Sequence, residues 1–202
     1  IMPATGKLKY NAGNQDKHMS GYSSLYRKNK EINTVGYYKV GLERYDIDVE
    51  LTASERVGFH RYTYPSSDNS RVIIDLGEGS ADRPTETYLT KVNDTTFQGH
   101  RFSSGWASDQ REYFTLILSK PVTDFILYDR DKKFKGDELK GTYVKGFLEF
   151  ETEKNEEIYV KMGVSTVSSE NALENLIAEI PHWDFDKVKK EAENKWNQEL
   201  SK

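Results

Sequence analysis

The 202-residue sequence contains no cysteine, which removes several kinds of protein chemistry from consideration. Without thiols there is no disulfide framework, no cysteine nucleophile and no zinc–sulfur centre. A chain free of cysteine fits either a reducing cytoplasm or a bacterial export route. No run of about 18 apolar residues is present, so no segment is expected to span a membrane as a helix. The chain opens on Ile1-Met2-Pro3 without a basic and apolar leader, so any export signal is expected upstream.

A surplus of positive charge is also missing. The 29 lysines and arginines are outnumbered by 33 acidic residues, for a net charge of −4. Nucleic-acid binding in general needs a positive surface that displaces counterions, so we expect no nucleic-acid partner. Hydrophobic residues at 36% and aromatic residues at 12% are enough to build a core and exclude the disordered class. The length fits one sizeable domain, or one domain with an appendage.

The clearest secondary-structure signal lies between Tyr45 and Pro65. Apolar and polar residues alternate over 45–52, which predicts a strand with one dry face and one solvent-facing face. A second, aromatic and β-branched run follows at 57–64. Its adjacent His60 and Arg61 must point to opposite faces, where they either form hydrogen bonds within the fold or are presented to a ligand.

Similar runs recur about every ten residues after Gly36, whereas residues 1–34 are rich in turn formers and are expected to be irregular. Asn93-Asp94 and Lys154-Asn155 predict hairpin turns. Short strands at this spacing, with turns between them, indicate an antiparallel β-sandwich. The further predicted strands cover residues 37–42, 71–76, 87–92, 96–102, 112–118, 123–128, 143–151 and 157–164.

The pattern becomes helical after Val164, which divides the chain into a sandwich domain at 1–165 and a helical segment at 166–202. Ser168 and Asp184 are the expected N-caps of two amphipathic helices. Because the second apolar stripe continues to the end of the chain, we expect it to pack on something beyond the sandwich. The stripes consist of Leu173, Leu176, Ile177 and Ile180, and of Phe185, Val188, Ala192, Trp196 and Leu200.

Several segments look like functional motifs and fail on inspection. The histidines at 18, 60, 100 and 182 show no metal-ligand spacing, so a structural role is predicted for each. The acidic stretch 129–138 does not match a calcium-binding EF-hand, because Lys133 occupies a ligand position and Gly136 is displaced. Gly77-Glu78-Gly79 is predicted to be a turn, since no helix follows it.

The segment Ser103-Ser104-Gly105-Trp106-Ala107 has a different interest. It lacks the Gly-x-Ser-x-Gly frame of a serine nucleophile, so no such nucleophile is predicted. Trp106 instead lies in a predicted loop between small residues that would let a flat ligand approach. An aromatic ring beside hydrogen-bonding groups is typical of sugar sites, but Trp106 filling the end of the sandwich remains an equal alternative.

Long strings across the chain resemble one known family. They include IMPATG from residue 1, GYYKVGL from 36, VELTASERVGFHRYTYP from 49, SSGWASDQ from 103 and VKMGVSTVSSENALENLIAEIPHWDFD from 160. In this order they resemble the amino-terminal domain of glycoside hydrolase family 92, bacterial exo-acting α-mannosidases. The resemblance implies a supersandwich-like β-sandwich, joined by a helical linker to an (α/α)6-barrel. It further implies calcium-dependent, inverting hydrolysis of α-mannosides, often α-1,2-linked.

For this chain the resemblance places the catalytic acid and base, and much of the calcium site, in a barrel beyond Lys202. It implies that this chain contains no catalytic residue and no metal ligand. The partners that it implies are mannose-containing glycans and the barrel itself. Trp106, Ser104, Asp109 and Glu31 are the residues expected near the sugar. Lys28 stands where the family usually has histidine, and Glu31 is retained.

The family's usual location implies a periplasmic, cell-surface or secreted protein. Two other classes of function stay open, a free-standing carbohydrate-binding module and a purely structural or interaction domain.

Overall fold

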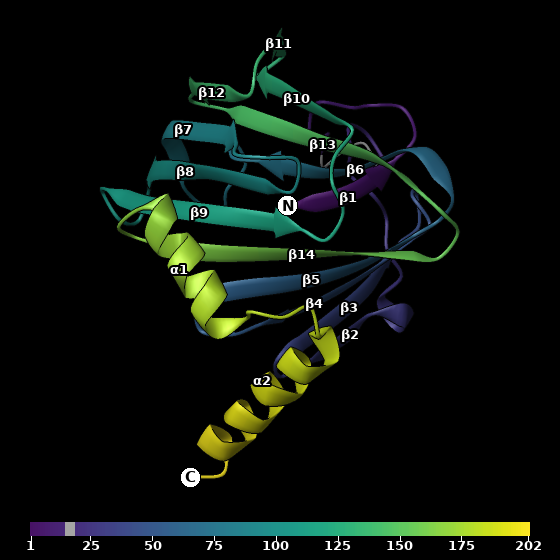
Figure 1. The fold of residues 1–202 in the computed structure, drawn as a ribbon, viewed down its shortest axis with the longest axis vertical. Coiled ribbons are helices and arrows are strands. Elements are labelled where there is room, and N and C mark those ends of the chain that lie inside the picture. The colour runs from purple at the N-terminus through teal and green to yellow at the C-terminus, as the bar shows by residue number, and fades with distance from the viewer. Residues whose placement is uncertain (15–18) are drawn as a thin grey trace.

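Two antiparallel sheets packed face to face, with two helices on the outer face of the larger sheet, form the fold of this chain (Figure 1). The computed structural model describes residues 1–14 and 19–202, so His18 lies outside the described residues. The predicted mainly β sandwich followed by two carboxy-terminal helices is confirmed.

The smaller sheet has five strands and all of its pairings are antiparallel. In spatial order the strands are β1 (Met2–Thr5), β6 (Ser67–Asp75), β13 (Val144–Thr152), β10 (Asp124–Asp129) and β11 (Lys132–Phe134).

The larger sheet has nine strands and is likewise antiparallel throughout. Its spatial order is β12 (Glu138–Gly141), β7 (Arg83–Lys91), β8 (Thr96–Ser104), β9 (Gln110–Leu118), β14 (Glu156–Ser165), β5 (Val57–Tyr64), β4 (Ile47–Ala53), β3 (Tyr37–Leu42) and β2 (Ile32–Thr34). A short 3-10 turn, η1 (Lys28–Lys30), precedes β2.

The main core lies between the two sheets. Tyr62 and Tyr64 of β5 point into it from the larger sheet, and Phe150 of β13 meets them from the smaller one. The Tyr64 and Phe150 rings are 5.5 Å apart and nearly perpendicular, a favourable aromatic geometry. Alternation along each strand therefore gives the larger sheet one face inside the sandwich and another available to the helices.

The second core lies between the outer face of the larger sheet and helices α1 (Ser169–Glu179) and α2 (Phe185–Leu200). Both predicted caps are confirmed, since the Ser168 side chain accepts a hydrogen bond from the Asn171 amide and Asp184 accepts one from the Lys187 amide. Gly163 lets α1 approach β14, because an added Cβ would lie 2.1 Å from the Ala172 carbonyl oxygen. The buried members of this cluster are Tyr37, Val57, Phe59, Leu176, Ile180, Phe185 and Val188.

The apolar stripe of α2 is only partly covered. Phe185 and Val188 are buried on the sandwich, whereas Trp196 is 53% exposed and Leu200 is 67% exposed. In Figure 1 the carboxy-terminal part of α2 projects away from both sheets. The expectation that the stripe packs beyond the sandwich is thus wrong for Phe185 and Val188, and stays a prediction for the exposed end of the helix.

His60 and Arg61 point to opposite faces of β5, as the alternation requires. The Nδ1 atom of His60 lies 2.6 Å from the Tyr62 hydroxyl oxygen, and burial lowers the pKa of His60 to about 4. Arg61 points outward and donates two hydrogen bonds to Glu50 on β4. Both side chains therefore form hydrogen bonds within the fold.

The solvent-facing side predicted for residues 45–52 is corrected by the structure. Asp48 is exposed, but Glu50 and Thr52 on the same face are buried because α2 lies over β4. The Arg61 guanidinium supplies the charge that makes the burial of Glu50 tolerable.

Some of the turns and strands predicted from local sequence patterns differ from the structure. Lys154-Asn155 is a tight turn, but not a hairpin, since β13 and β14 belong to different sheets. The hairpin at Asn93-Asp94 is confirmed by the pairing of β7 with β8. The expectation that residues 1–34 are irregular is wrong at β1, which pairs with β6, and at β2, which pairs with β3.

Candidate functional site

Trp106 lies at the tip of the loop that joins β8 to β9, at residues 105–109. Its side chain is 102% exposed, so filling the end of the sandwich is excluded. The loop is closed by a hydrogen bond from the Gly105 amide to the Ala107 carbonyl oxygen, 2.9 Å long. This geometry presents the whole indole to the surroundings of the domain.

A hollow of about 410 Å³ lies beside Trp106. Its polar lining includes Glu78, Gln110, Glu112 and the partly buried Arg101. One aromatic face next to several hydrogen-bonding groups is the combination by which proteins hold small polar rings such as sugars. The lining therefore has the chemistry that suits a compact, hydroxyl-rich group.

Three of the four predicted sugar-facing residues lie together in this region. Ser104 ends β8 and lines a neighbouring hollow with Gly105, while Asp109 ends the loop and is paired with Arg111 at 3.2 Å. Trp106 and Asp109 thus lie on the β8–β9 loop, and Ser104 is the strand residue immediately before it.

Glu31 lies elsewhere. It accepts a hydrogen bond of 2.8 Å from the Tyr38 hydroxyl, at the β2 edge of the larger sheet. Burial, together with this carboxylate, raises the pKa of Tyr38 to about 12. Five strand spacings separate β9 from β2, or roughly 24 Å at the usual distance between strands. Within this chain Glu31 and Trp106 are therefore not members of one compact site.

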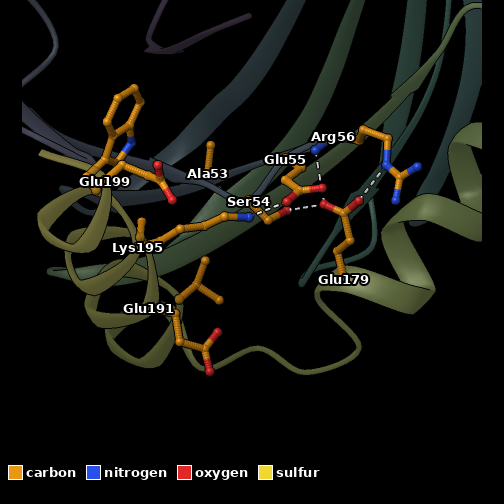
Figure 2. A pocket seen from close by; sticks show the side chains of 11 residues that line it. Ala53, Ser54, Glu55, Arg56, Glu179, Glu191, Lys195 and Glu199 are labelled. Atoms are coloured by element: carbon orange, nitrogen blue, oxygen red, sulfur yellow. Dashed lines mark hydrogen bonds and ion pairs between the residues drawn. The ribbon is translucent and has the colours of Figure 1, made fainter. Parts of the chain in front are cut away.

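A larger cavity, of about 690 Å³, lies between α2 and the turn from β4 to β5 at residues 54–56 (Figure 2). Glu179 of α1 accepts hydrogen bonds there from the Ser54 hydroxyl and from the Arg56 amide and Nε. Lys195 of α2 reaches across to pair with Glu55.

The Glu179 carboxylate in this cavity is held by hydrogen bonds within the fold. Burial pushes the pKa of Glu179 upward, but the bonds from Ser54 and Arg56 outweigh it and hold this pKa below its ordinary value. A general acid needs a raised pKa, so Glu179 is unsuited to that role. We interpret the cavity as the seam between α2 and the sheet, walled by the half-exposed Trp196.

Comparison with protein families gives these observations a context. Residues 1–165 match the family model described as the Glycosyl hydrolase family 92 N-terminal domain. This chain belongs to glycoside hydrolase family 92.

Solved structures of family 92 share the fold. The family 92 α-mannosidase BT3965 from Bacteroides thetaiotaomicron is 30% identical, with a TM-score of 0.93 over 98% of this chain and 28% of its own. The same enzyme in complex with mannoimidazole gives the same identity and TM-score. The family 92 inverting mannosidase BT2199 from that organism is 20% identical, with a TM-score of 0.83 over 99% of this chain and 26% of its own, a likeness of fold alone. No curated protein matches significantly. This family 92 chain therefore spans little more than a quarter of the length of these relatives.

For the calcium ion that the sequence resemblance implies in the parent enzyme, no complete site is present among residues 1–14 and 19–202 of this family 92 domain. No group of three or more histidine, aspartate or glutamate side chains there is arranged to hold a metal ion. In the same residues no buried side-chain nitrogen or oxygen is without a hydrogen-bond partner. The described part of the chain also contains no helix that is long and apolar enough to cross a membrane.

The sequence pattern did not single out Arg101 and Asp82, which lie beneath the Trp106 loop of the family 92 domain. Arg101 lies on β8 four residues after the buried Phe97 and on the same, inward face. A charged residue at such a position is the signal that was available.

Proposed function

We propose that this chain is the amino-terminal domain of an exo-acting α-mannosidase, and that the parent protein hydrolyses terminal α-linked mannose from glycans. The match of residues 1–165 to the family 92 domain carries this proposal. The 30% identity to a solved α-mannosidase over nearly the whole chain supports it.

In this proposal the parent enzyme is inverting, depends on calcium and prefers α-1,2 linkages, and this chain is inactive by itself. Inversion needs an acid on the leaving oxygen and a base on water, with carboxyl groups about 6.5–9.5 Å apart. Glu55 and Glu179, in the larger cavity, are both engaged by cationic side chains, and Asp82 beneath Trp106 is engaged by Arg101. This occupation supports a source outside the chain for the two catalytic carboxylates and for most calcium ligands.

The domain would contribute to substrate binding through the β8–β9 loop. Trp106 would stack against a mannose ring, with Ser104 and Asp109 beside it, while Glu31 would act at a separate edge. Residues 166–202 would be the linker, with Trp196 and Leu200 packing on the (α/α)6-barrel. The half-exposed apolar end of α2 supports that arrangement.

The experiment compares this chain with the longer protein that contains it, using a chromogenic α-mannoside and a separate assay of α-1,2-mannobiose. We expect turnover by the longer protein only, abolished by chelation of calcium. Turnover by the purified 202-residue chain would contradict the proposed location of the catalytic groups. In the longer protein, Trp106→Ala should raise KM about tenfold or more, in line with the loss of one stacking contact. Val92→Ala, at an exposed position in the turn between β7 and β8, is the control.

A second candidate is a free-standing carbohydrate-binding module, favoured by the complete exposure of Trp106. Titration of this chain with mannosides, monitored by tryptophan fluorescence, distinguishes the two functions. Millimolar or tighter binding that is lost in Trp106→Ala would favour the module.

A further inference from the structure

Two loops that are distant in sequence meet beneath Trp106. One is the β6–β7 connection at residues 76–82, which leads from the smaller sheet to the larger one. The other is the β8–β9 loop. The Arg101 guanidinium lies between them. Its Nη1 and Nη2 atoms bond both oxygens of Asp82, at 2.5 and 3.0 Å, and its Nε donates to the Leu76 carbonyl oxygen at 3.0 Å.

The Arg101–Asp82 pair is built into the fold. The Arg101 side chain is 16% exposed and that of Asp82 is 14% exposed, in contrast to the exposed pair of Asp109 and Arg111 on the neighbouring loop. The bidentate bond to Arg101, followed by a hydrogen bond with Ser103, lowers the pKa of Asp82 to about 2. The Asp82 carboxylate therefore remains ionised at neutral and mildly acidic pH.

Two glycines allow the loops to approach this closely. A Cβ added to Gly79 would lie 2.3 Å from the Arg101 Nη2 atom, so the guanidinium occupies the space of that side chain. A Cβ added to Gly105 would lie 2.8 Å from the Ala81 carbonyl oxygen and 2.9 Å from the Asp82 Cβ. The residue that precedes Trp106 thus rests directly on the loop that Arg101 holds.

We infer that Arg101 and Asp82 are positioning residues. They fix the β6–β7 connection where it contacts Gly105, and so hold the Trp106 indole at the adjacent hollow. Arg101 and Trp106 line the same hollow, but the guanidinium is taken up by Asp82 and Leu76 and acts on the loop rather than on a ligand. The consequence for sugar binding rests on the proposed function, whereas the effect on the loop does not.

The physical reason is preorganisation. A short loop with glycine and small residues has many conformations. The apparent affinity for a ligand that needs one of them is reduced to the fraction of molecules in that conformation. The Trp106 side chain is exposed and has little packing of its own, so its position depends on its backbone. A rigid support beneath Gly105 therefore raises the fraction of molecules whose indole is ready to stack.

The first experiment measures loop motion in this chain by ¹⁵N relaxation of the Gly105, Trp106 and Ala107 amides and the Trp106 indole. In the native chain the backbone order parameters should be near those of β8 and β9, about 0.85. Arg101→Met and Asp82→Asn should both lower them to below about 0.6. Arg101→Lys should do the same, since an ammonium cannot make the bidentate bond.

Controls separate this effect from general destabilisation. Arg71→Met removes an even more buried guanidinium from the pair with Glu149 in the other sheet, and should leave the Trp106 loop unchanged. If an Arg101 variant does not fold, Gly105→Ala tests the same contact. It perturbs the β8–β9 loop where it meets the β6–β7 connection and leaves the ion pair in place. Native order parameters in Asp82→Asn and in Gly105→Ala would overturn the inference.

The second experiment measures α-mannoside hydrolysis by the longer protein. Arg101→Met should raise KM several-fold with little change in kcat, and the double variant with Trp106→Ala should be no worse than Trp106→Ala alone. Additive effects would overturn action through Trp106, as would a KM unchanged in Arg101→Met but raised in Trp106→Ala. If Trp106→Ala itself leaves KM unchanged, the proposed sugar-binding role fails, and the relaxation data still decide whether Arg101 holds the loop.

Discussion

Arg61 and Glu50 face each other across β5 and β4, with Arg61 Nε 2.8 Å from Glu50 Oε2 and Nη2 2.9 Å from Oε1. The same guanidinium lies 4.5 Å from the centre of the Phe185 ring and 3.3 Å from the Asp186 carboxylate, at the start of α2. One side chain thus joins two strands to the helix that leads out of the sandwich.

Arg61→Met should destabilise the domain by about 3–5 kcal/mol, because it leaves the Glu50 carboxylate buried without its cation. Urea unfolding followed by circular dichroism measures the change. Arg27→Met is the control, since Arg27 pairs with Glu43 at an exposed site and should cost less than about 1 kcal/mol. The Arg61→Met and Glu50→Gln double variant should recover part of the loss, and no recovery would contradict the pairing.

Gly163→Ala should loosen the contact of α1 with β14. The new methyl group would lie 2.1 Å from the Ala172 carbonyl oxygen and 3.0 Å from the Leu176 Cβ, so the helix must move. We expect a loss of about 1–3 kcal/mol, as for overpacking in other cores, measured by urea unfolding. Gly41→Ala has 3.4 Å of clearance to the Asp48 carboxylate and should be close to neutral. Equal effects of the two substitutions would contradict the packing described for α1.

His60 should make the stability of the domain depend on pH. Burial lowers its pKa from 6.5 to about 4, so the unfolded chain binds a proton below pH 6.5 that the folded chain takes up only near pH 4. Stability should therefore fall as pH decreases from about 6.5 to about 4, by up to about 3 kcal/mol from this residue. His60→Gln should flatten this part of the pH profile of the unfolding free energy.

His100→Gln is the matched control, because it removes an imidazole that is paired with Glu86 on β7. A profile as steep in His60→Gln as in the native chain would show that other groups carry the acid sensitivity.

Lys161 should stabilise the segment that connects α1 to α2. Its Nζ atom is buried and donates hydrogen bonds to the Ile180 and His182 carbonyl oxygens at 3.0 and 3.5 Å, under the Trp183 ring. Lys161→Met removes these bonds, so we expect faster amide exchange in the first turn of α2 and a loss of about 1–3 kcal/mol. Lys187→Met, at an exposed position of the same helix, should leave exchange unchanged. Unchanged exchange in Lys161→Met would remove Lys161 from this role.

Much of the fold follows from local pattern. The alternation in β4 and β5 and the caps at Ser168 and Asp184 predict their elements, because period and capping chemistry act within a few residues. Strands of three or four residues, such as β1 and β2, carry too few positions for alternation to appear. They exist because longer strands, β6 and β3, offer them hydrogen-bonding edges.

The candidate site was predictable only in part. Trp106 is recognisable because a large aromatic residue between small, turn-forming neighbours has nowhere to pack locally. Arg101 and Asp82 are not recognisable as a pair, since 19 positions separate them and their encounter depends on a crossing between sheets. The assignment of the four sugar-facing residues to mannose stays a prediction.

The sequence by itself determined the longer strands and both helices, where the helices begin, and the family to which the chain is similar. Tertiary structure alone decided that β13 and β14 enter different sheets and that α2 covers the polar face of β4. Backbone period and capping are properties of adjacent residues, whereas sheet membership and burial depend on contacts between distant parts of the chain. The Arg61–Glu50 and Arg101–Asp82 pairs arise from such contacts.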